Sequence, residues 1–572
     1  MVGKNELAAR IFYEIADMLE IQGVAWKPIA YRKAARTLES LGEDVEEIYR
    51  RGGVKALREL PGVGEAIAGK IEEIIKTGTL HYYEELKRGM PIDFAALTSI
   101  PGLGPKRAKK LYDALGVRNL DDLRKAAMAH KIRTVEGFDE KTEENILKGL
   151  ALLEKTKGRA LLGHVLPEIN RIIESLRALR AVKQISPAGS VRRMKETIGD
   201  IDVLITSDRP EEVMAAFVKL PQVEEVVVQG PTKTSVRLKS GLNCDVRVVE
   251  DAAYGAALQY FTGSKDHNIA LRRIAVKRGW KLNEYGLFKG AKRIAGKTEE
   301  EVYAKLGLQW IPPEMRENAG EVELAAKGKL PKLVEPAAIK GDFHVHTKWS
   351  DGQYSVEEMA LAAQRLGYEY IALTDHGSKI GVARGLKDKD FEKREKEIER
   401  VQKKVGVRIL QGTEVDIEKD GSLYLKDETL RKLSIVVAAV HSNFNMPREQ
   451  MTARMVRAME NEHVDILAHP SGRLIGEREG YQVDYERLFE AAKRTGTLIE
   501  INAFPSRLDL WDSLIRQAKE YGIRFAIGTD AHSTEHLRFM QLGVAMARRG
   551  WCEGKDIINT LPYKELAREL GL

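Results

Sequence analysis

The sequence predicts a multidomain protein in which an all-α region, an α+β region and an α/β region follow one another. The chain has 572 residues, which is several times the usual size of a single domain. Its hydrophobic pattern changes from a helical period, through short β-branched runs, to a regular alternation of strand and helix patterns. With 43% apolar and 31% charged residues, the composition excludes disordered and fibrous chains.

The first region, from about residue 5 to 155, is predicted to be helical. Apolar residues recur at helical spacing, for example over 6–21 and 66–76, and Gly/Pro turns separate the segments. Two near-repeats share the pattern Leu/Ile-Pro-Gly-x-Gly followed by a helix, at 57–74 and 97–115, and a weaker third copy lies at 134–147. We therefore expect two helical domains, 1–90 and 91–155.

The glycines of these repeats suggest phosphate binding. Glycine permits a left-handed turn that exposes backbone N–H groups, and the positive end of the following helix adds to the attraction for an anion. One copy alone is more often an ordinary helix-helix turn, but two copies with lysines and arginines after the second favour DNA binding. The expected contact residues are Gly62, Gly64, Gly102, Gly104, Lys106 and Arg107.

The α+β region is predicted to carry a magnesium site. Runs at 201–205, 224–229, 235–238 and 244–249 predict a sheet within 156–250, and 251–315 mixes helix and short strands. Asp200 and Asp202 alternate on one strand and so share a face, and Asp245 begins another β-type run. Such carboxylates suit two Mg²⁺ ions, with Gly189 and Ser190 placed to bind phosphate oxygens. The alternative is an exposed strand edge with solvated charges.

A proline-rich segment, 316–339, is the expected linker to the α/β region at 340–572, where repeated βα units imply a parallel sheet or barrel.

Eight of the twelve histidines lie after residue 340. In a βα barrel the strand ends converge on one rim, which would gather several histidines and carboxylates. We assign His463 and His536 to the surface. The nine expected metal ligands are His344, His346, Asp351, His376, Glu414, His441, His469, Asp530 and His532. A set of this size suggests two or three ions, and imidazoles favour Zn²⁺, Mn²⁺ or Fe²⁺ over Mg²⁺.

Charge and cysteine content point to an intracellular protein. The two cysteines lie far apart, which excludes a disulfide framework, and we see neither a signal peptide nor a membrane span. We expect a cytoplasmic protein that does not bind membranes. The net charge of +7 is uneven: residues 1–339 carry 56 Lys and Arg against 48 Asp and Glu, whereas residues 340–572 carry 36 against 37.

The run G-S-x-R-R followed by G-D-I-D-V-L resembles the nucleotidyltransferase signature of family X DNA polymerases, and YFTGSKDHN at 260–268 resembles their nucleotide-pocket motif. The resemblance implies a helix-hairpin-helix region, a palm and a thumb. It implies that Asp200, Asp202 and Asp245 bind the palm metal ions. Ser190 and Arg193 would contact the triphosphate. The other substrate-binding residues that it implies are Tyr260 and Phe261 at the sugar, Gly263 in the same motif, and Asn268 and Arg272 at the nascent pair.

Near the amino terminus the resemblance is incomplete. Lys70 matches the family's Schiff-base lysine of 5′-deoxyribose phosphate lyase, and Lys27, Tyr31 and Lys33 match its supporting site. However, Ala66 and Tyr82 stand where vertebrate repair members carry lysines. Lys70 therefore has two interpretations, a lyase nucleophile and a phosphate-binding residue.

The histidine set resembles the PHP (polymerase and histidinol phosphatase) domain, a distorted βα barrel, and all nine of its ligand positions are filled here. The resemblance implies a phosphoesterase that uses Mn²⁺ or Zn²⁺, with Lys379 or Arg473 as phosphate clamps.

For the whole chain we expect a monomer that fills short gaps in DNA repair from dNTPs on gapped or primer-template DNA. The PHP domain would add 3′-5′ exonuclease and abasic-site endonuclease activity. The alternatives are a PHP phosphatase on small molecules with a DNA-targeting module, and a non-catalytic scaffold.

Overall fold

The computed structural model describes residues 4–39, 41, 44–89, 92–100, 102–156, 158–379 and 385–571. The chain divides into two compact units, residues 1–157 with 474–479, and residues 158–473 with 480–572. Among the described residues, no helix combines the length and the apolar character that a membrane crossing requires.

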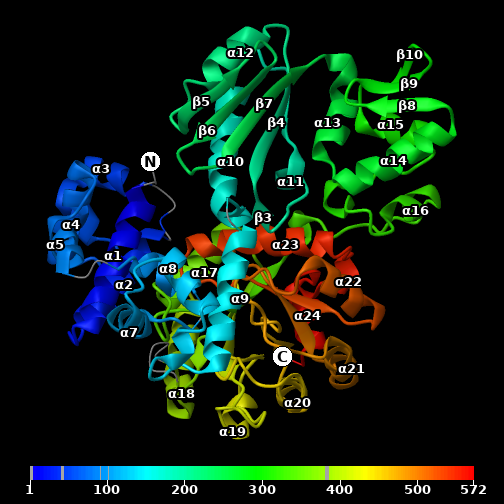
Figure 1. Cartoon of the computed structure of the whole chain (residues 1–572). Coiled ribbons are helices and arrows are strands. Elements are labelled where there is room, and N and C mark those ends of the chain that lie inside the picture. The colour runs from blue at the N-terminus through cyan, green and yellow to red at the C-terminus, as the bar shows by residue number, and fades with distance from the viewer. Residues whose placement is uncertain are drawn as a thin grey trace. The chain divides into compact units, whose positions relative to one another are not determined.

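The first unit is helical (Figure 1), as the sequence predicts. Its helices are α1 (Lys4–Ile21), α2 (Lys27–Glu39), α3 (Val45–Arg58), α4 (Glu65–Thr77), α5 (His81–Gly89), α6 (Phe94–Thr98), α7 (Pro105–Leu115), α8 (Leu120–Met128) and α9 (Glu140–Thr156). Apolar side chains spaced three and four residues apart, such as Phe12, Ile15 and Leu19 on α1, are buried. One apolar core runs from Ala8 to Leu150, so the two predicted helical domains share a core.

The palm region of the second unit is a five-stranded sheet in the order β2-β4-β7-β6-β5. Its strands are β2 (Gln184–Pro187), β4 (Asp200–Thr206), β5 (Val223–Gln229), β6 (Lys233–Leu238) and β7 (Asn243–Val249), and β1 (Ala160–Leu161) pairs separately with β3 (Thr197–Ile198). Strands β4 and β7 run parallel, whereas their neighbours pair antiparallel. Helices α10 (Leu162–Arg177), α11 (Gly189–Arg192), α12 (Pro210–Phe217) and α13 (Tyr254–Thr262) pack around the sheet.

The thumb region follows as a small three-stranded sheet with helices. Its elements are α14 (Lys265–Lys277), β8 (Trp280–Asn283), β9 (Gly286–Lys289), β10 (Lys292–Ala295), α15 (Glu299–Lys305) and α16 (Glu321–Ala326). The segment 316–339, which the sequence predicts as a linker, is folded: Val322, Ala325 and Leu333 are buried in the thumb core. Apolar residues between the prolines account for this packing, because they remove apolar surface from water.

The carboxy-terminal region is a barrel of parallel strands with helices around it, as the βα pattern predicts. The strands are β11 (Gly341–Val345), β12 (Tyr370–Leu373), β13 (His376–Gly377), β14 (Arg408–Asp416), β15 (Ile435–Ala439), β16 (Ile466–Leu467), β17 (Leu498–Asn502) and β18 (Phe525–Gly528). A parallel bridge between Val345 and Ala531 connects the first strand to the segment after the last and closes the barrel. The helices are α17 (Val356–Arg365), α18 (Asp388–Gln402), α19 (Asp427–Leu430), α20 (Arg448–Met459), α21 (Tyr485–Thr495), α22 (Asp512–Glu520), α23 (Met540–Arg549) and α24 (Tyr563–Glu569).

Candidate active sites

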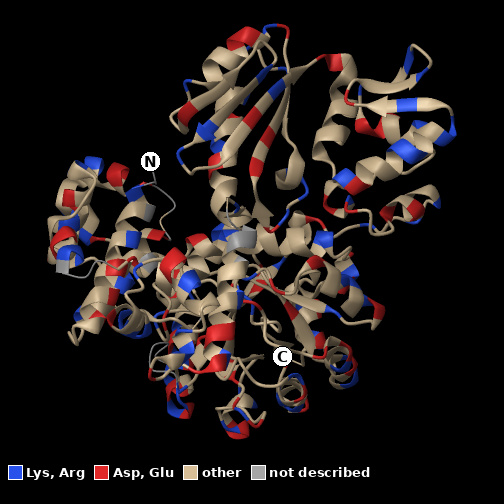
Figure 2. Cartoon of the chain, viewed as in Figure 1, with Lys and Arg blue, Asp and Glu red and all other residues tan. Residues whose placement is uncertain are grey.

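The palm sheet brings three carboxylates to one face. Asp202 on β4 and Asp245 on β7 are register partners, and Asp200 lies two residues before Asp202 on the same side of its strand. Acidic positions on these neighbouring strands appear in red in Figure 2. Burial, and then the charges of Asp200 and Asp245, raise the pKa of Asp202 to about 6. Three carboxylates crowded together in this way form a site that a divalent cation would neutralise.

The predicted triphosphate loop touches this site. Gly189 has a φ of +58°, and a Cβ atom there would lie 2.8 Å from Oδ2 of Asp202, so only glycine fits. The N–H of Ala188 donates to the carbonyl of Asp202 at 2.8 Å. Ser190 lies in the short helix α11, half-buried. The carboxylates and the loop are therefore parts of one site.

The side chain of Arg193 is held by the thumb. Its Nε lies 3.2 Å from Glu317, and its Nη1 donates to the carbonyl of Thr262. The neighbouring Arg192 pairs at 2.8 Å with Glu299, a buried carboxylate. Glu299 and Glu317 could not be predicted from the sequence, because they lie more than 100 residues from their partners.

The YFTGS motif forms the end of α13 and the turn after it. The rings of Tyr260 and Phe261 meet edge to face with centroids 5.2 Å apart, and the guanidinium of Arg247 lies 4.6 Å from the centre of the Phe261 ring. Gly263 approaches Arg193, since a Cβ there would lie 3.1 Å from Nη1.

Asn268 and Arg272 lie on the next helix, α14. The amide of Asn268 donates to the carbonyl of Tyr260 at 2.7 Å, and its Oδ1 accepts from Gln259 at 2.6 Å. Arg272 donates through Nε to the carbonyl of Asn268 at 3.3 Å. Asn268 is only 8% exposed, so in this conformation its side chain orients the motif.

The two helical hairpins have the same backbone geometry. Gly62 and Gly102 both have a φ of +77°, and Gly64 and Gly104 are the N-cap residues of α4 and α7, without a side-chain cap. The first N–H groups of both helices therefore lack a side-chain acceptor, as phosphate binding requires. Pro101 of the second hairpin lies outside the described residues.

The basic residues of the second hairpin differ in their contacts. Lys106 is exposed. Arg107 donates to the carbonyls of Gly102 and Gly137 at 2.9 and 3.0 Å and lies over the ring of Phe138. Arg107 thus connects the second hairpin to the third, and of this pair only Lys106 has an exposed side chain.

Lys70 lies on α4, half-buried, with its Nζ 5.2 Å from the centre of the Tyr82 ring. Tyr31 is buried, which raises its pKa to about 12, while Lys27 and Lys33 are exposed. The stem of Lys33 packs against Gly62, where a Cβ would lie 2.7 Å from its Cγ.

The barrel gathers all nine predicted ligands at the carboxyl ends of its strands. Glu414 lies at the centre, with ring nitrogens of five histidines between 2.8 and 3.7 Å from its oxygens. Three groups have ligand atoms within 4.8 Å of one another: His346 with Asp351, His376 and His532; His344 with His346 and Asp530; and His376 with Glu414 and His441. His469 joins them through its Nε2, 2.9 Å from Glu414.

Buried atoms without a hydrogen-bond partner concentrate in this cluster. Among the described residues they include Nε2 of His344, both ring nitrogens of His346, Oδ1 of Asp351 and Oε2 of Glu414. Burial alone would raise the pKa of Glu414, but the surrounding histidines hold it well below its usual range. Buried polar atoms are normally satisfied, so a set of unsatisfied nitrogens and oxygens that face one another fits metal ions.

Two further carboxylates, which were not predicted from the sequence, contact the predicted ligands. Glu500 lies 2.6 Å from Nδ1 of His344, and Asp416 lies 2.7 Å from Nδ1 of His441. Such contacts fix the tautomer of a metal-binding histidine. The signal that could have identified Asp416 is its position on β14, two residues after Glu414 and on the same face of the strand.

The two predicted phosphate clamps both pair with carboxylates, and one histidine that was expected at the surface is partly buried. Lys379 is exposed and pairs with Glu418 at 3.2 Å. The guanidinium of Arg473 is occupied by Glu196 at 2.7 Å and by backbone carbonyls. His536, expected at the surface, instead packs between the rings of Phe504 and Phe539 and accepts from the N–H of His532 at 3.3 Å. Its position behind a predicted ligand explains this burial.

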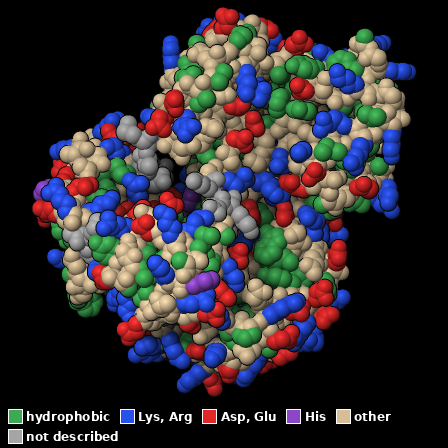
Figure 3. Space-filling model, in the orientation of Figure 1, with side chains coloured by type: hydrophobic (Ala, Val, Ile, Leu, Met, Phe, Trp, Pro, Cys, Tyr) green, Lys and Arg blue, Asp and Glu red, His purple; other side chains and the backbone are tan. Residues whose placement is uncertain are grey.

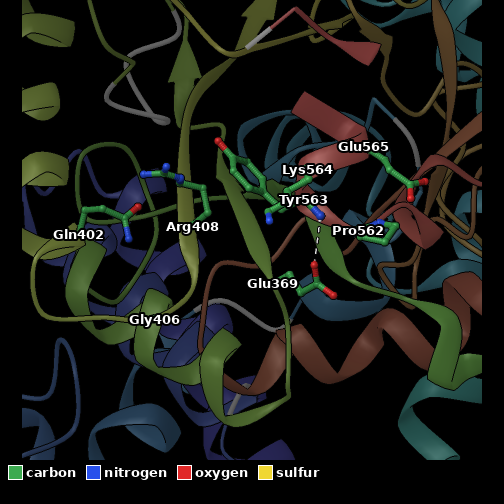
Figure 4. A pocket seen from close by; sticks show the side chains of 8 residues that line it. All are labelled: Glu369, Gln402, Gly406, Arg408, Pro562, Tyr563, Lys564 and Glu565. Carbon is green, nitrogen blue, oxygen red and sulfur yellow. Dashed lines mark hydrogen bonds between the residues drawn. The ribbon is translucent and has the colours of Figure 1, made fainter. Parts of the chain in front are cut away.

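A cavity of about 580 Å³ lies apart from both sites (Figure 4). It is lined by Glu369, Gln402, Gly406, Arg408, Pro562, Tyr563, Lys564 and Glu565. The Arg408 guanidinium lies 5.2 Å from the centre of the Tyr563 ring, and Glu369 accepts from the N–H of the same tyrosine. The cavity contains none of the predicted site residues.

Comparisons with known proteins match the chain from end to end. Family models match a helix-hairpin-helix domain at residues 3–80, a SAM-like helix-hairpin-helix tandem at 94–151, a DNA polymerase beta thumb at 257–317 and a PHP domain at 342–504. The DNA polymerase/3'-5' exonuclease PolX of Bacillus subtilis is 39% identical over 563 residues, 97% of each chain. Probable phosphatases of Thermoanaerobacter sp. and Acetivibrio thermocellus are 35% and 33% identical over 33% of this chain and 78% of theirs.

Proposed function

The chain belongs to the family X DNA polymerases that carry a PHP exonuclease domain, and within that family we propose that it fills short gaps in damaged DNA. The palm would extend the 3′ end from dNTPs, and the barrel would remove nucleotides in the 3′-5′ direction and cut at abasic sites. The observation that carries the proposal is the contact of the triphosphate loop with the carboxylate face, where Gly189 meets Asp202.

The palm residues fit two Mg²⁺ ions. Asp200, Asp202 and Asp245 offer only carboxylate oxygens, which are the ligands that Mg²⁺ prefers, and burial together with the charges of the other two raises the pKa of Asp202 to about 6. Bound there, the ions would polarise the 3′-hydroxyl and neutralise the developing charge on the phosphates. Ser190 and the N–H groups near it would orient the triphosphate, and Tyr260 and Phe261 would pack against the sugar.

The barrel residues fit two or three ions of the Mn²⁺ or Zn²⁺ class. Imidazole nitrogens outnumber carboxylates in the cluster, and the unsatisfied buried atoms face one another. The ions would supply Lewis acidity to the scissile phosphodiester. Glu414 and Asp530 would hold them, while Glu500 and Asp416 would orient histidine ligands.

The helical unit would bind the gapped DNA. Exposed N–H groups at the starts of α4 and α7 would receive backbone phosphates without reading base sequence. For Lys70 we propose phosphate binding on the 5′ side of the gap, since Ala66 and Tyr82 replace the lysines that would accompany it in a lyase site. Borohydride trapping of a 5′-deoxyribose phosphate end tests this choice: a Lys70-dependent covalent adduct would overturn it.

Two variants test the proposed activities. We expect Asp200→Ala with Asp202→Ala to abolish primer extension on a gapped duplex and to leave 3′-5′ hydrolysis unchanged. His344→Ala should do the reverse. Matched controls are Asp208→Ala, an exposed carboxylate in the palm, and His463→Ala, a histidine outside the metal cluster. If His344→Ala left hydrolysis intact, the barrel would not be the exonuclease site.

A second candidate function is hydrolysis of small phosphate esters by the barrel. It is favoured by the 35% identity of this region to proteins that are named probable phosphatases. Competing assays on histidinol phosphate and on a 3′-recessed duplex distinguish the two. We expect the duplex to be the better substrate, because the helical unit adds phosphate contacts that a small ester cannot use.

A further inference from the structure

A carboxylate between two arginines connects the triphosphate loop to the PHP barrel. Oε1 of Glu317 lies 3.2 Å from Nε of Arg193 and 3.1 Å from Nη1 of Arg549. The first arginine belongs to the palm loop, and the second is the last residue of α23 in the barrel region. Lys195 lies farther away, 3.8 Å from the same oxygen, and is more exposed.

Arg549 is held more firmly than a surface arginine. Its side chain is 2% exposed, and besides Glu317 it contacts the carboxylate of Asp512 and donates to the backbone carbonyl of Arg193 at 2.7 Å. Arg549 therefore contacts the backbone of Arg193 directly, and it contacts the side chain of Arg193 indirectly through the shared carboxylate of Glu317.

The surrounding interface fixes this arrangement. At Gly163 on α10, a Cβ atom would lie 2.7 Å from Pro505 and 2.8 Å from Leu542 of α23, so helix and barrel are in close contact. Beyond the loop, Glu196 pairs with Arg473 at 2.7 Å. The palm segment 193–196 is thus attached to the barrel at both of its ends.

We propose that Arg549 is a positioning residue for nucleotide binding in the palm. The inference rests on the proposed polymerase function. Glu317 lies close enough to neutralise Arg193, which would then attract a triphosphate weakly. Arg549 binds the same carboxylate and the backbone carbonyl of Arg193, so it limits how closely Glu317 can pair with Arg193. Because Asp512 balances the charge of Arg549, the barrel contributes the placement of Glu317 and not a net charge.

The test is steady-state primer extension by the full chain with Arg549→Gln. We expect the KM for dNTP to rise about tenfold, with kcat within about twofold of the wild type, because the variant leaves the catalytic carboxylates in place. Adding Glu317→Gln to this variant should return the KM to within about threefold of the wild type, since the carboxylate that neutralises Arg193 is then gone. A purely structural role for Arg549 would make the double variant at least as defective as the single one.

The adjacent Arg548→Gln is the matched control. This arginine also crosses the interface, but within the described part of the chain its ion pairs are with Glu314 and Glu335, outside the palm loop. We expect its KM for dNTP to stay within about twofold of the wild type. Exonuclease activity of every variant, measured on a 3′-recessed duplex, reports whether the protein is folded.

Several outcomes would overturn the inference. They are an unchanged KM in folded Arg549→Gln, a double variant that is worse than the single one, and a KM rise of threefold or more in Glu317→Gln alone. Glu317→Gln tests the inference even if Arg549→Gln does not fold. Glu317 is partly exposed, and the inference predicts that its removal does not raise the KM. If the wild type itself failed to extend primers, the proposed function would fail first, which is a distinguishable result.

Discussion

At the scale of single residues, the barrel site depends on carboxylates that stand behind the predicted ligands. Asp416 lies 2.7 Å from Nδ1 of His441, and Nε2 of that histidine faces Glu414 at 3.1 Å. The carboxylate therefore fixes which nitrogen is free to bind a metal ion.

We expect Asp416→Asn to lower exonuclease activity by about 10- to 100-fold, the usual cost of removing such an orienting partner. Primer extension should be unchanged, because the palm lies outside the contact. The measurement is the rate of 3′-end removal as Mn²⁺ is added back to protein from which a chelator has removed the metal, with Asp420→Asn, an exposed neighbour that pairs with Arg457, as control. Equal metal dependence of the two variants would refute an orienting role.

The two sites differ in how far sequence could predict them at this scale. The nine barrel ligands lie in short motifs at strand ends, so their convergence follows from the fold class alone. The contacts of Arg193 could not be predicted, since Glu317 is 124 residues away and Arg549 is 356 residues away.

At the scale of elements, one buried carboxylate joins α11 to the thumb. Glu299 at the start of α15 is 4% exposed and pairs with Arg192 at 2.8 Å and with the fully buried Arg316 at 2.6 Å. Burial alone would raise the pKa of Glu299, but Arg316 and Arg192 outweigh it and hold the pKa below its usual range. The stabilisation is present at neutral pH and is lost as the pH falls below the ordinary carboxyl pKa of about 4.5.

We expect Glu299→Ala to destabilise the folded chain by about 3–5 kcal/mol, because it leaves two arginines without their buried partner. Chemical denaturation monitored by circular dichroism measures the loss. The difference from the wild type should be constant between about pH 7 and pH 5 and should shrink as the pH falls below about 4.5, because the unfolded chain then takes up a proton that the two arginines keep off the folded carboxylate. Glu300→Ala, the next residue on the same helix, serves as control, and an equal loss in both variants would contradict the assignment.

The starts of α4 and α7 allow a test of the phosphate contacts. Gly64 and Gly104 have negative φ angles, and a Cβ atom at either position would meet nothing within 4 Å, so alanine fits the free protein. We expect Gly64→Ala with Gly104→Ala to weaken binding of a gapped duplex by about tenfold, because the methyl groups stand where phosphates approach. Titration by fluorescence anisotropy checks this. Gly69→Ala, within α4 and also without a neighbour within 4 Å, should bind normally.

Secondary-structure elements were largely predictable because each carries its own hydrophobic period. Strands β4, β5, β6 and β7 of the palm fall on the four predicted runs, whereas β2 falls outside them, and the comparisons confirm the fold class. The segment 316–339 shows the limit of such patterns. Its prolines suggest a linker, whereas its buried Val322 and Leu333 belong to a core that they share with thumb residues between 256 and 315.

At the scale of the whole molecule, one chain carries two candidate metal sites that differ in the type of ligand. The palm offers three carboxylates at a partly exposed sheet face, whereas the barrel offers buried imidazoles and carboxylates. Surface charge does not distinguish the two regions on the face that Figure 3 shows, because basic and acidic side chains are interspersed there. The difference lies in ligand type and burial, and it should appear in how tightly each site keeps its ions.

We expect dialysis of the purified chain against metal-free buffer to remove the palm ions and to leave the barrel ions bound. Carboxylate sites bind Mg²⁺ weakly and exchange it readily, whereas clustered imidazoles keep transition metals. Elemental analysis after dialysis should find about two or three transition-metal ions per chain, and fewer in His346→Ala, whose ring joins two of the three ligand groups. Extension should return on adding Mg²⁺ alone, while exonuclease activity should need no added metal. Loss of both activities together, with both restored by Mg²⁺, would show instead that the barrel binds its ions no more tightly than the palm.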